Sequence, residues 1–316
     1  MKEGLGMKDI VAVGEVLIDL TQKGTDELGV GQYAANPGGA PANLAVAAAR
    51  LGASTAFVGK VGADAFGAYL RRVLEENRVD TRGMLTDPQE HTTLAVVSVD
   101  GTGERSFSFY RDPSADVNLR AEEIPADLLR GTRVVHFGSV SLTAEPARSA
   151  TLYAAKTARK NGSLVSYDPN YRASLWHSQE EAVAQMKAAL PLCDILKISD
   201  EELPLLTGTT DPAEGSRQLS ALGIRLIFVT LGAEGAFFRM GEQTGSVPGI
   251  RVQVGDTNGA GDTFFGAALS LLVKEDLDKL TLERLTQIAA FANKAASITT
   301  SRHGAIPAMP TLEEVV

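Results

Sequence analysis

The residues of this sequence best suited to chemistry lie in one short segment, where a carboxylate follows a run of small residues. Residues 256–262 read Asp-Thr-Asn-Gly-Ala-Gly-Asp and precede an apolar stretch that predicts a buried helix. The glycines let the backbone approach a ligand closely, and the free amides at a helix N-terminus favour a phosphate. A carboxylate beside such a cradle, here Asp262, suits a base that deprotonates a hydroxyl attacking phosphorus. The alternative is a Gly-rich loop capped by an acidic residue.

A second Gly-rich turn lies closer to the N-terminus of the chain. Residues 37–43 read Pro-Gly-Gly-Ala-Pro-Ala-Asn and lead into a helix, expected over 44–51, that is built almost wholly from small residues. Pro41 is well placed near the first turn of that helix, and Asn43 is the polar exception among alanines. A phosphate cradle with an acid, together with a second Gly-Gly turn that has Asp and Asn nearby, fits phosphoryl transfer to a polyol.

The elements that must position these residues alternate between strands and helices. Strands are expected at 10–14, 55–59, 134–137, 164–168, 194–198 and 226–231, and helices near 66–74, 146–160, 178–190, 212–222 and 281–300. Repeated units of this kind imply a mostly parallel sheet with helices on both faces. Ligands collect at the carboxyl ends of such strands, where Asp19, Asp168, Lys197 and Thr230 fall.

Three segments interrupt this alternation. Residues 92–111 predict a β-hairpin around a turn at 100–103, and Phe107, Phe109 and Arg111 share one face of its second strand, where they would suit a cover over a polar ligand. The alternative is an ordinary half-buried hairpin. Residues 21–37 are polar and turn-rich. Residues 235–254 are hairpin-like, and their last part, 250–254, alternates like a strand. The hairpin segments are therefore expected to form a lid on a single domain.

Composition excludes several classes of protein. The chain has 316 residues and a formal net charge of −9, which argues against a nucleic-acid partner but not against an anionic substrate at a local site. Its one cysteine, Cys193, rules out an intrachain disulfide framework and is consistent with a reduced, cytoplasmic setting. No apolar run is long enough to span a membrane, and no signal-peptide pattern is present.

Several familiar motifs are missing as well. The lysine-bearing phosphate loop GxxxxGK[ST], the dinucleotide fingerprint GxGxxG after the first strand and the GxSxG nucleophile elbow do not occur. The four histidines are widely spaced, and the chain has a single cysteine, Cys193, so no metal-ligand cluster is expected.

The two Gly-rich motifs resemble the two signatures of the ribokinase/PfkB sugar kinases. They occur in the right order and roughly 200 residues apart, which is far more specific than either motif alone. Further matches lie at 13–19, 109–111, 167–172, 197–202 and 304–308, so the resemblance covers nearly the whole chain. The combination is most similar to the fructokinase branch of the family.

The resemblance implies a role for each matched residue of the sugar and phosphoryl sites. Asp262 would be the base that takes the proton from the terminal hydroxyl of the sugar, and the amides of Gly259, Ala260 and Gly261 would form the anion hole. The sugar would be held by Asp19, Gly38, Gly39 and Asn43, with Arg111 and Arg172 as further contacts and Phe107 or Phe109 closing over the ring.

The resemblance also implies ATP, Mg²⁺ and a monovalent cation such as K⁺. The residues matching the ATP groove are Lys197, Thr230, Gly232, Gly235 and Asn293. Glu202 matches an acid that organises Mg²⁺ through water, and Asp256 matches a carboxylate near a monovalent-cation site. Two residues depart from the family pattern: Ser199 stands where Asn is frequent, and Asn258 stands where Thr is common.

Structural alternatives exist for three of these residues. Arg172 could pair with a neighbouring acid, Lys197 could be a solvated lysine at a strand end, and Asn293 could bond along its own helix.

The implied fold is a ribokinase-like three-layer α/β/α domain over residues 8–316. It would have a mostly parallel central sheet and a small β-stranded lid, formed by insertions near 15–37 and 92–115. The implied activity is ATP-dependent phosphorylation of D-fructose to D-fructose 6-phosphate. The alternatives within the family are 2-keto-3-deoxygluconate kinase, ribokinase and nucleoside kinases such as aminoimidazole riboside kinase.

Two further hypotheses concern class and assembly. A non-catalytic sugar- or nucleotide-binding regulator on the same fold is the alternative from a different class, and the intact Asp262 speaks against it. The exposed strand edges of the lid suggest a homodimer through the lid. The expected partners are a small-molecule sugar and ATP, with no nucleic acid and no membrane.

Overall fold

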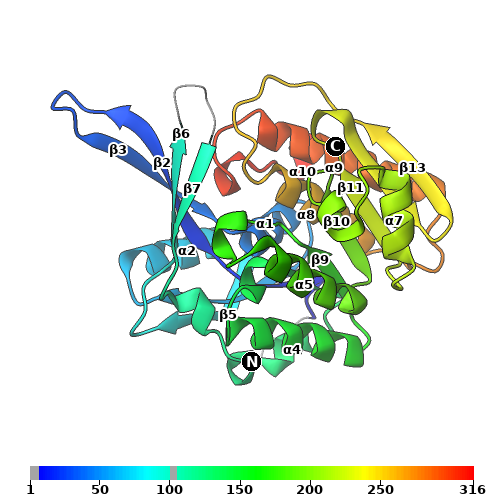
Figure 1. The fold of residues 1–316 in the computed structure, drawn as a ribbon, viewed down its shortest axis with the longest axis horizontal. Helices are drawn as coiled ribbons and strands as arrows, with labels where there is room; N and C mark the ends of the chain where they lie inside the picture. The colour runs from blue at the N-terminus through cyan, green and yellow to red at the C-terminus, as the bar shows by residue number, and fades with distance from the viewer. Residues whose placement is uncertain (1–6, 100–104) are drawn as a thin grey trace.

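The computed structural model describes residues 7–99 and 105–316, which form two β-sheets and the helices that cover the larger sheet (Figure 1). The larger sheet has nine strands, in the order β13 (Gln243–Pro248), β12 (Gly235–Met240), β11 (Leu226–Thr230), β10 (Ile195–Ser199), β9 (Leu164–Asp168), β8 (Val134–Gly138), β1 (Ile10–Val13), β4 (Thr55–Gly62) and β5 (Val79–Asp87). The strands from β11 to β5 run parallel, and β12 and β13 extend the sheet as an antiparallel hairpin. The predicted mostly parallel sheet is confirmed.

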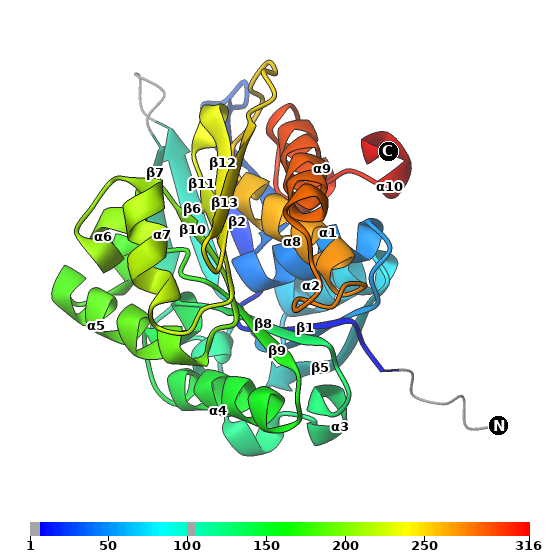
Figure 2. The same cartoon turned by 90° about the vertical axis from the view of Figure 1, so that its right-hand side faces the viewer.

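Helices cover both faces of this sheet, as Figure 2 shows. One face carries α1 (Ala40–Arg50), α2 (Ala65–Glu76), α8 (Ala260–Leu272) and α9 (Leu282–Thr300). The other carries α3 (Ala126–Leu129), α4 (Ala147–Lys160), α5 (Gln179–Ala189), α6 (Leu203–Thr207) and α7 (Pro212–Ser220), and the short α10 (Leu312–Val315) ends the chain. None of the helices that the structure describes is long and apolar enough to cross a membrane.

Strand β1 shows why the sequence produces three layers. Val11 and Val13 point into the core under α4, whereas Ile10 and Ala12 point into the cores under α8 and α1. A strand that is buried on both faces needs an apolar side chain at every position, so β1 reads as a continuous apolar run.

A second, four-stranded sheet stands beside the larger one. Its order is β3 (Gly31–Gly38), β2 (Leu17–Thr25), β6 (Leu94–Val99) and β7 (Arg105–Tyr110). β2 pairs antiparallel with β3 and parallel with β6, and β6 pairs antiparallel with β7. The β2–β3 hairpin projects away from the body of the molecule (Figure 1). These strands come from the two insertions expected near 15–37 and 92–115; the turn expected at 100–103 lies outside the described residues.

Segment 21–37 differs from its sequence expectation. It forms most of β2 and β3 instead of a series of turns. The outer residues of this hairpin are exposed one after another, so no apolar alternation marks them as strands. The edge strand β5 is likewise absent from the elements that the sequence pattern predicts.

The prediction of a strand at 250–254 is wrong, because β13 ends at Pro248. The first residue of β12, Gly235, pairs with the last residue of β13, Pro248, and in the described part of the chain no strand pairs with the residues directly beyond Pro248. The apolar side chains of Ile250 and Val254 are exposed as a result. Alternation of apolar residues predicts a strand only where a partner strand is available.

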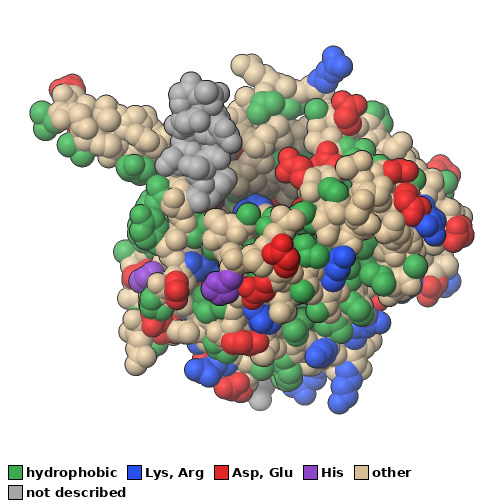
Figure 3. All heavy atoms as spheres, viewed as in Figure 1, with side chains coloured by type: hydrophobic (Ala, Val, Ile, Leu, Met, Phe, Trp, Pro, Cys, Tyr) green, Lys and Arg blue, Asp and Glu red, His purple; other side chains and the backbone are tan. Residues whose placement is uncertain are grey.

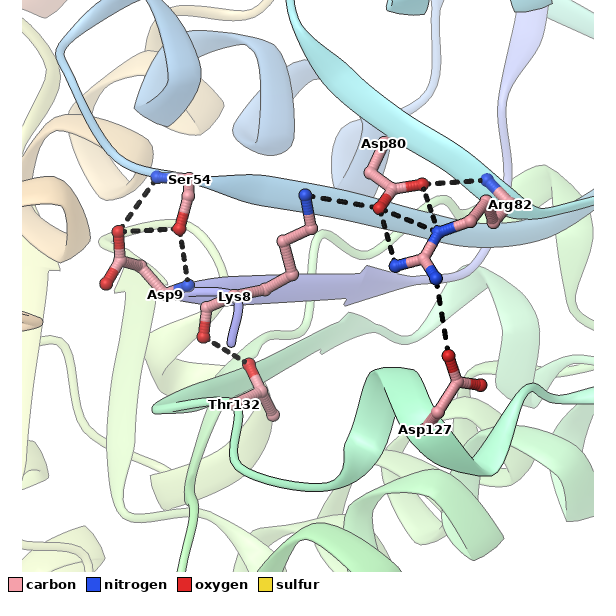
Figure 4. Close-up of polar contacts among 7 residues, drawn as sticks. All are labelled: Lys8, Asp9, Ser54, Asp80, Arg82, Asp127 and Thr132. Carbon is pink, nitrogen blue, oxygen red and sulfur yellow. Dashed lines mark hydrogen bonds and ion pairs between the residues drawn. The ribbon is translucent and has the colours of Figure 1, made fainter. Parts of the chain in front are cut away.

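Charged side chains hold together the amino ends of β1, β4 and β5 (Figure 4). Asp9 Oδ2 accepts hydrogen bonds from the amide of Ser54 at 2.8 Å and from its hydroxyl at 2.9 Å. Asp80 binds Lys8 at 3.1 Å and Arg82 at 2.8 Å. Burial opposes ionisation of Asp80, but Arg82 and Lys8 outweigh it and lower the pKa of this carboxyl to about 2. These contacts fasten the end of the sheet opposite to the carboxyl ends, where ligands of such folds bind.

Candidate active site

Two helices bring the two Gly-rich motifs together. Helix α1 follows Gly39 and α8 follows Gly259, and both glycines have a positive φ, 102° and 76° respectively. The helices approach closely because Gly266 has no side chain: a Cβ there would lie 2.8 Å from the carbonyl oxygen of Leu44. Motifs that are far apart in the sequence are therefore side by side at the N-termini of α1 and α8.

Asp262 lies in the first turn of α8 and is 9% exposed. Its Oδ2 accepts a hydrogen bond of 2.8 Å from Nδ2 of Asn43, on α1. Burial raises the pKa of the Asp262 carboxyl, and the bond from Asn43 and the nearby cations of Lys197 and Arg172 oppose that rise. A raised pKa brings a carboxylate closer to the range in which it accepts a proton at neutral pH, as a general base must.

A pocket opens in front of Asp262, and the space-filling view shows a hollow between the small sheet and the α/β body (Figure 3). Six residues predicted at the site line this pocket: Asp19, Gly39, Asn43, Phe109, Arg172 and Asp262. Six other residues also line it: Glu15, Leu17, Ala40, Val140, Asn170 and Asn258. All but Val140 belong to the matched motifs, so motif membership was the signal that could have found them.

Asp19 faces the Gly-rich loop across the pocket. Asn258 Nδ2 donates a hydrogen bond of 3.2 Å to Asp19 Oδ2. Gly38 does not line the pocket but leaves room for this carboxylate, because a Cβ at position 38 would lie 2.5 Å from Asp19 Oδ2. Burial raises the pKa of Asp19 to about 6, while Asn258 and Arg172 act to lower it.

Glu15 is a buried carboxyl of the pocket and is not among the residues predicted at the site. Its Oε1 accepts a hydrogen bond of 3.1 Å from the amide of Ala40, and its buried Oε2 has no hydrogen-bond partner among residues 7–99 and 105–316. Burial raises the pKa of Glu15 to about 7. The pocket therefore contains three carboxyl groups, those of Glu15, Asp19 and Asp262.

The first amides of α8 form the candidate anion hole. The amide of Ala260 donates to the carbonyl of Thr257 at 3.3 Å, whereas the amides of Gly261 and Asp262 belong to the first helical turn, which offers them no intrahelical acceptor. The helix dipole adds partial positive charge at the same point. A Cβ at Gly261 would lie 3.0 Å from Nζ of Lys197, so the ammonium group lies directly behind this loop.

Lys197 is buried, not solvated at a strand end. It is 6% exposed, and its Nζ lies 3.0 Å from Asp168 Oδ2. Burial disfavours the ammonium, but Asp168, Glu202 and Asp262 outweigh it and raise the pKa of Lys197. Burial raises the pKa of the Asp168 carboxyl, while the ammonium of Lys197, in an ion pair with it, acts to lower that pKa.

Asp256 fixes the loop from the other side. Its Oδ1 accepts a hydrogen bond of 2.8 Å from the amide of Asn258, and its Oδ2 accepts one of 3.3 Å from the amide of Gly304. The amide of Asp256 itself donates to the carbonyl of Thr300, at the end of α9. The position of the anion hole therefore depends on the C-terminal end of α9.

Arg111 lies outside the lining of the pocket. It comes directly after the end of β7, so it does not follow the strand alternation that would place it beside Phe109. Its guanidinium is buried and donates hydrogen bonds to Asp116 Oδ2 at 2.8 Å, Thr143 Oγ1 at 2.6 Å and the carbonyl of Val140 at 3.1 Å. Arg111 thus supports the wall of the pocket at Val140 from behind.

Two of the other residues predicted to contact or cover the sugar, Arg172 and Phe109, line the pocket. Arg172 lines it, and its Nη1 donates to the carbonyl of Tyr171 at 3.0 Å; no acid pairs with it among the described contacts. Phe109, on β7, lines the pocket from the small sheet. The side chain of Phe107 lies outside the described residues.

The residues predicted at the nucleotide side lie at the ends of β11, β12 and β13. Thr230 ends β11, and Gly232 begins a 3₁₀ turn with a φ of 53°. Gly235 begins β12, where a Cβ would lie 2.1 Å from the carbonyl oxygen of Val247. Asn293 Nδ2 donates to the carbonyl of Pro248 at 3.1 Å, so it joins α9 to β13 instead of bonding along its own helix.

Glu202 links two loops at the same edge of the sheet. Its Oε1 accepts a hydrogen bond of 2.6 Å from the amide of Tyr171, and its Oε2 accepts bonds of 3.0 Å from both the amide and the hydroxyl of Ser199. Carboxylate oxygens have further lone pairs, so Glu202 can also accept a water molecule bound to Mg²⁺. Within residues 7–99 and 105–316, no three His, Cys, Asp or Glu side chains could hold a metal ion directly.

Comparison with known proteins matches residues 7–312 to the pfkB family of carbohydrate kinases. The chain is 43% identical to fructokinase-1 of Zea mays over 98% of this chain and 97% of the relative. The fold is similar to that of the fructokinase from Xylella fastidiosa with bound ATP, with a TM-score of 0.91 at 34% identity over 98% and 97% of the two chains. It is also similar to a fructokinase double mutant from Vibrio cholerae O395 in the fructose, ADP and potassium ion bound form, with a TM-score of 0.88 at 35% identity over 98% and 97%.

Proposed function

Because the chain belongs to the pfkB family of carbohydrate kinases, we propose that it transfers the γ-phosphoryl group of ATP to a hydroxyl of D-fructose and so yields D-fructose 6-phosphate. The observation that carries this proposal is the buried Asp262 at the N-terminus of α8, facing a pocket lined with polar side chains. Fructose as the sugar is supported by the fructokinases to which the chain is similar along nearly its whole length.

In this proposal the sugar lies between the small sheet and α1. Asp19 and Asn43 accept hydrogen bonds from its hydroxyls, since carboxylate and amide oxygens are strong acceptors. Gly38 and Gly39 allow the backbone to approach the ring. Arg172 is a further contact, and Phe109, with Phe107 as its alternative, closes over the ring.

Asp262 takes the proton from the terminal hydroxyl as the hydroxyl oxygen attacks phosphorus. Asn43 holds one oxygen of this carboxylate, which leaves the other to accept the proton. The amides of Gly259, Ala260 and Gly261 stabilise the negative charge that develops on the transferred group, with Ala260 exchanging its 3.3 Å bond to Thr257 for a phosphate oxygen. The ammonium of Lys197 lies close to Gly261 and adds positive charge there.

ATP, Mg²⁺ and K⁺ complete the proposed site. Thr230, Gly232, Gly235 and Asn293 border the nucleotide. The oxygen donors fit hard cations: Glu202 would hold Mg²⁺ through water, and Asp256 would lie near the monovalent cation. Mg²⁺ supplies neutralisation of charge on the phosphate oxygens when it is bound.

We also propose one kinase domain over residues 8–316, with the small sheet as a lid and as the interface of a homodimer. The β2–β3 hairpin exposes Leu28 (88%), Val30 (55%) and Tyr33 (51%), and apolar side chains on an exposed edge favour association. Nucleic acid and membrane are not partners in this proposal. A cytoplasmic location is supported by Cys193, which is a free, buried thiol.

A coupled assay of ADP release tests the activity. With ATP, Mg²⁺ and K⁺ present, we expect ADP only when a sugar is added, and faster release with fructose than with ribose, glucose, 2-keto-3-deoxygluconate or a nucleoside. Faster release with another sugar would overturn fructose and keep the chemistry. ATP binding without turnover of any sugar would overturn the kinase and favour a non-catalytic regulator.

Asp262→Asn tests the mechanism in the same assay. Loss of a general base should lower kcat by about 10²–10⁴-fold. Calorimetry should show fructose and ATP still binding, and circular dichroism should show an intact fold. A variant that folds and retains the wild-type kcat would overturn Asp262 as the base.

A further inference from the structure

We propose that Asn258 is a positioning residue that holds the Asp19 carboxylate in the orientation needed to bind the sugar. This inference rests on the proposed function and adds a specific device to it. Its basis is the hydrogen bond of 3.2 Å from Asn258 Nδ2 to Asp19 Oδ2, between two residues that both line the pocket and are 239 positions apart in the chain.

Both ends of this hydrogen bond are held in place. The backbone amide of Asn258 donates to Asp256 Oδ1 at 2.8 Å, within the loop that carries the anion hole. Asp19 lies on β2, where its backbone is paired with that of Asn36 on β3, and Gly38 has no side chain that would displace the carboxylate. The contact thus ties the small sheet directly to the anion-hole loop.

The chemistry of the pair suits a carboxylate that must stay ionised in a buried place. Asp19 is 7% exposed, and burial is the main influence against its charge. Asp256 and Asp262 add repulsion, whereas Arg172 attracts the carboxylate from the loop after β9. Asn258 donates a hydrogen bond to the carboxylate without adding a charge, and it leaves the other oxygen of Asp19 for a sugar hydroxyl.

Two consequences distinguish this role from a purely structural one. Without Asn258, the Asp19 carboxylate should be free to rotate away, so the sugar should bind more weakly while ATP binds as before. The pKa of Asp19 should also rise above its value of about 6, because the donated bond acts to lower it. As the pH is lowered, sugar binding that requires the ionised carboxylate should therefore be lost at a higher pH than in the wild type.

The test compares Asn258→Ala with a matched control, Asn36→Ala. Asn36 donates a hydrogen bond of 3.1 Å to Thr21 Oγ1 on the same small sheet and does not line the pocket. Calorimetry of fructose binding without ATP, from pH 5 to 8, should show about tenfold weaker binding for Asn258→Ala, the size expected for a lost bond to a charged group. The pH at which binding fails should move upward, and Asn36→Ala should match the wild type.

The outcomes separate this inference from the proposed function. Fructose binding by Asn258→Ala with wild-type affinity and pH dependence would overturn the inference alone. Equal weakening by Asn258→Ala and Asn36→Ala would overturn it too, since it would indicate a general effect on the small sheet. A wild-type protein that neither binds nor phosphorylates fructose would overturn the proposed substrate and the inference with it.

Discussion

At the scale of single residues, the pocket collects three carboxyl groups that are harder to ionise than usual. The pKa is raised to about 7 for Glu15 and to about 6 for Asp19, and it is raised for Asp262 as well, in each case chiefly by burial. Amide donors oppose this effect at two of them, Asn258 at Asp19 and Asn43 at Asp262. A polyhydroxylated ligand brings further donors, so a pocket of this kind gains more from a polyol than from an apolar ligand.

Glu15 makes the stability of the protein depend on pH. Its pKa is about 7 in the folded chain against an ordinary value of 4.5, so between these values the folded state binds more protons than the unfolded state. Stability contributed by this group is therefore greatest at low pH and declines as the pH rises through about 7. Glu15→Gln should remove this group's contribution to the decline and stabilise the protein at pH 8 by up to about 3 kcal/mol, at 1.36 kcal/mol per pKa unit.

Thermal unfolding at two pH values checks this prediction. The Tm of Glu15→Gln should exceed that of the wild type at pH 8, and the difference should shrink towards pH 5. Glu27→Gln, which changes an exposed carboxyl on the small sheet, should leave the Tm unchanged at both pH values. A Glu15→Gln variant whose Tm at pH 8 is equal to or below that of the wild type would contradict the prediction.

At the scale of elements, the starts of α1 and α8 determine the site. Each helix begins after a glycine in a conformation that other residues rarely adopt, and the N-termini meet because α1 and α8 pack through small residues. Gly39 is the more constrained of the two. A Cβ there would lie 2.7 Å from the carbonyl oxygen of Glu15 and 2.9 Å from Cα of Val16, so it would collide with the backbone between β1 and β2.

Gly39→Ala should therefore destabilise the fold and distort the pocket. Its φ of 102° alone should cost about 1–3 kcal/mol, and the collision with backbone atoms should add to that. Gly24→Ala is the matched control, because Gly24 has a φ of 117° but no atom within 4 Å of an added Cβ. Urea unfolding should show the larger loss for Gly39→Ala. An equal loss in both variants would contradict the proposed collision.

At the scale of the whole molecule, the small sheet is separate from the nine-stranded sheet, and its role does not follow from the three-layer body. It closes one side of the pocket through Asp19 and Phe109. Its β2–β3 hairpin extends into solvent (Figure 1) and exposes apolar side chains, among them Leu28 and Tyr33. Strands that contribute to a site on one side and expose apolar residues on the other fit a lid that is also an interface between subunits.

Size-exclusion chromatography with light scattering tests the dimer. The wild type should elute as a dimer over a range of concentrations, and the double variant Leu28→Lys, Tyr33→Lys should shift to the mass of a monomer because its like charges would repel across the interface. Leu222→Lys is the control, since Leu222 is 51% exposed but lies on the connection between α7 and β11, away from the small sheet. A strictly monomeric wild type would contradict the interface.

Local rules of the sequence determined much of this protein. Apolar runs of strand length alternating with helix-period segments predicted the order of the three-layer body, because each pattern depends on residues only a few positions apart. The Gly-rich segments before α1 and α8 marked the helix starts that carry Asn43 and Asp262. Their backbone requirements are also local: a positive φ at Gly39 and Gly259 and free amides in the first turn of α8.

Only the tertiary structure decided what depends on neighbours from distant parts of the chain. Residues 250–254 lack a partner strand and stay irregular, whereas the polar segment 21–37 finds partners and forms strands. Arg111 does not line the pocket, because its guanidinium donates hydrogen bonds to Asp116 and Thr143 instead. The contact between Asp19 and Asn258 spans 239 positions and joins the small sheet to the loop before α8, the helix that packs against α1. Such contacts follow from strand order and helix packing, which no short window of sequence contains.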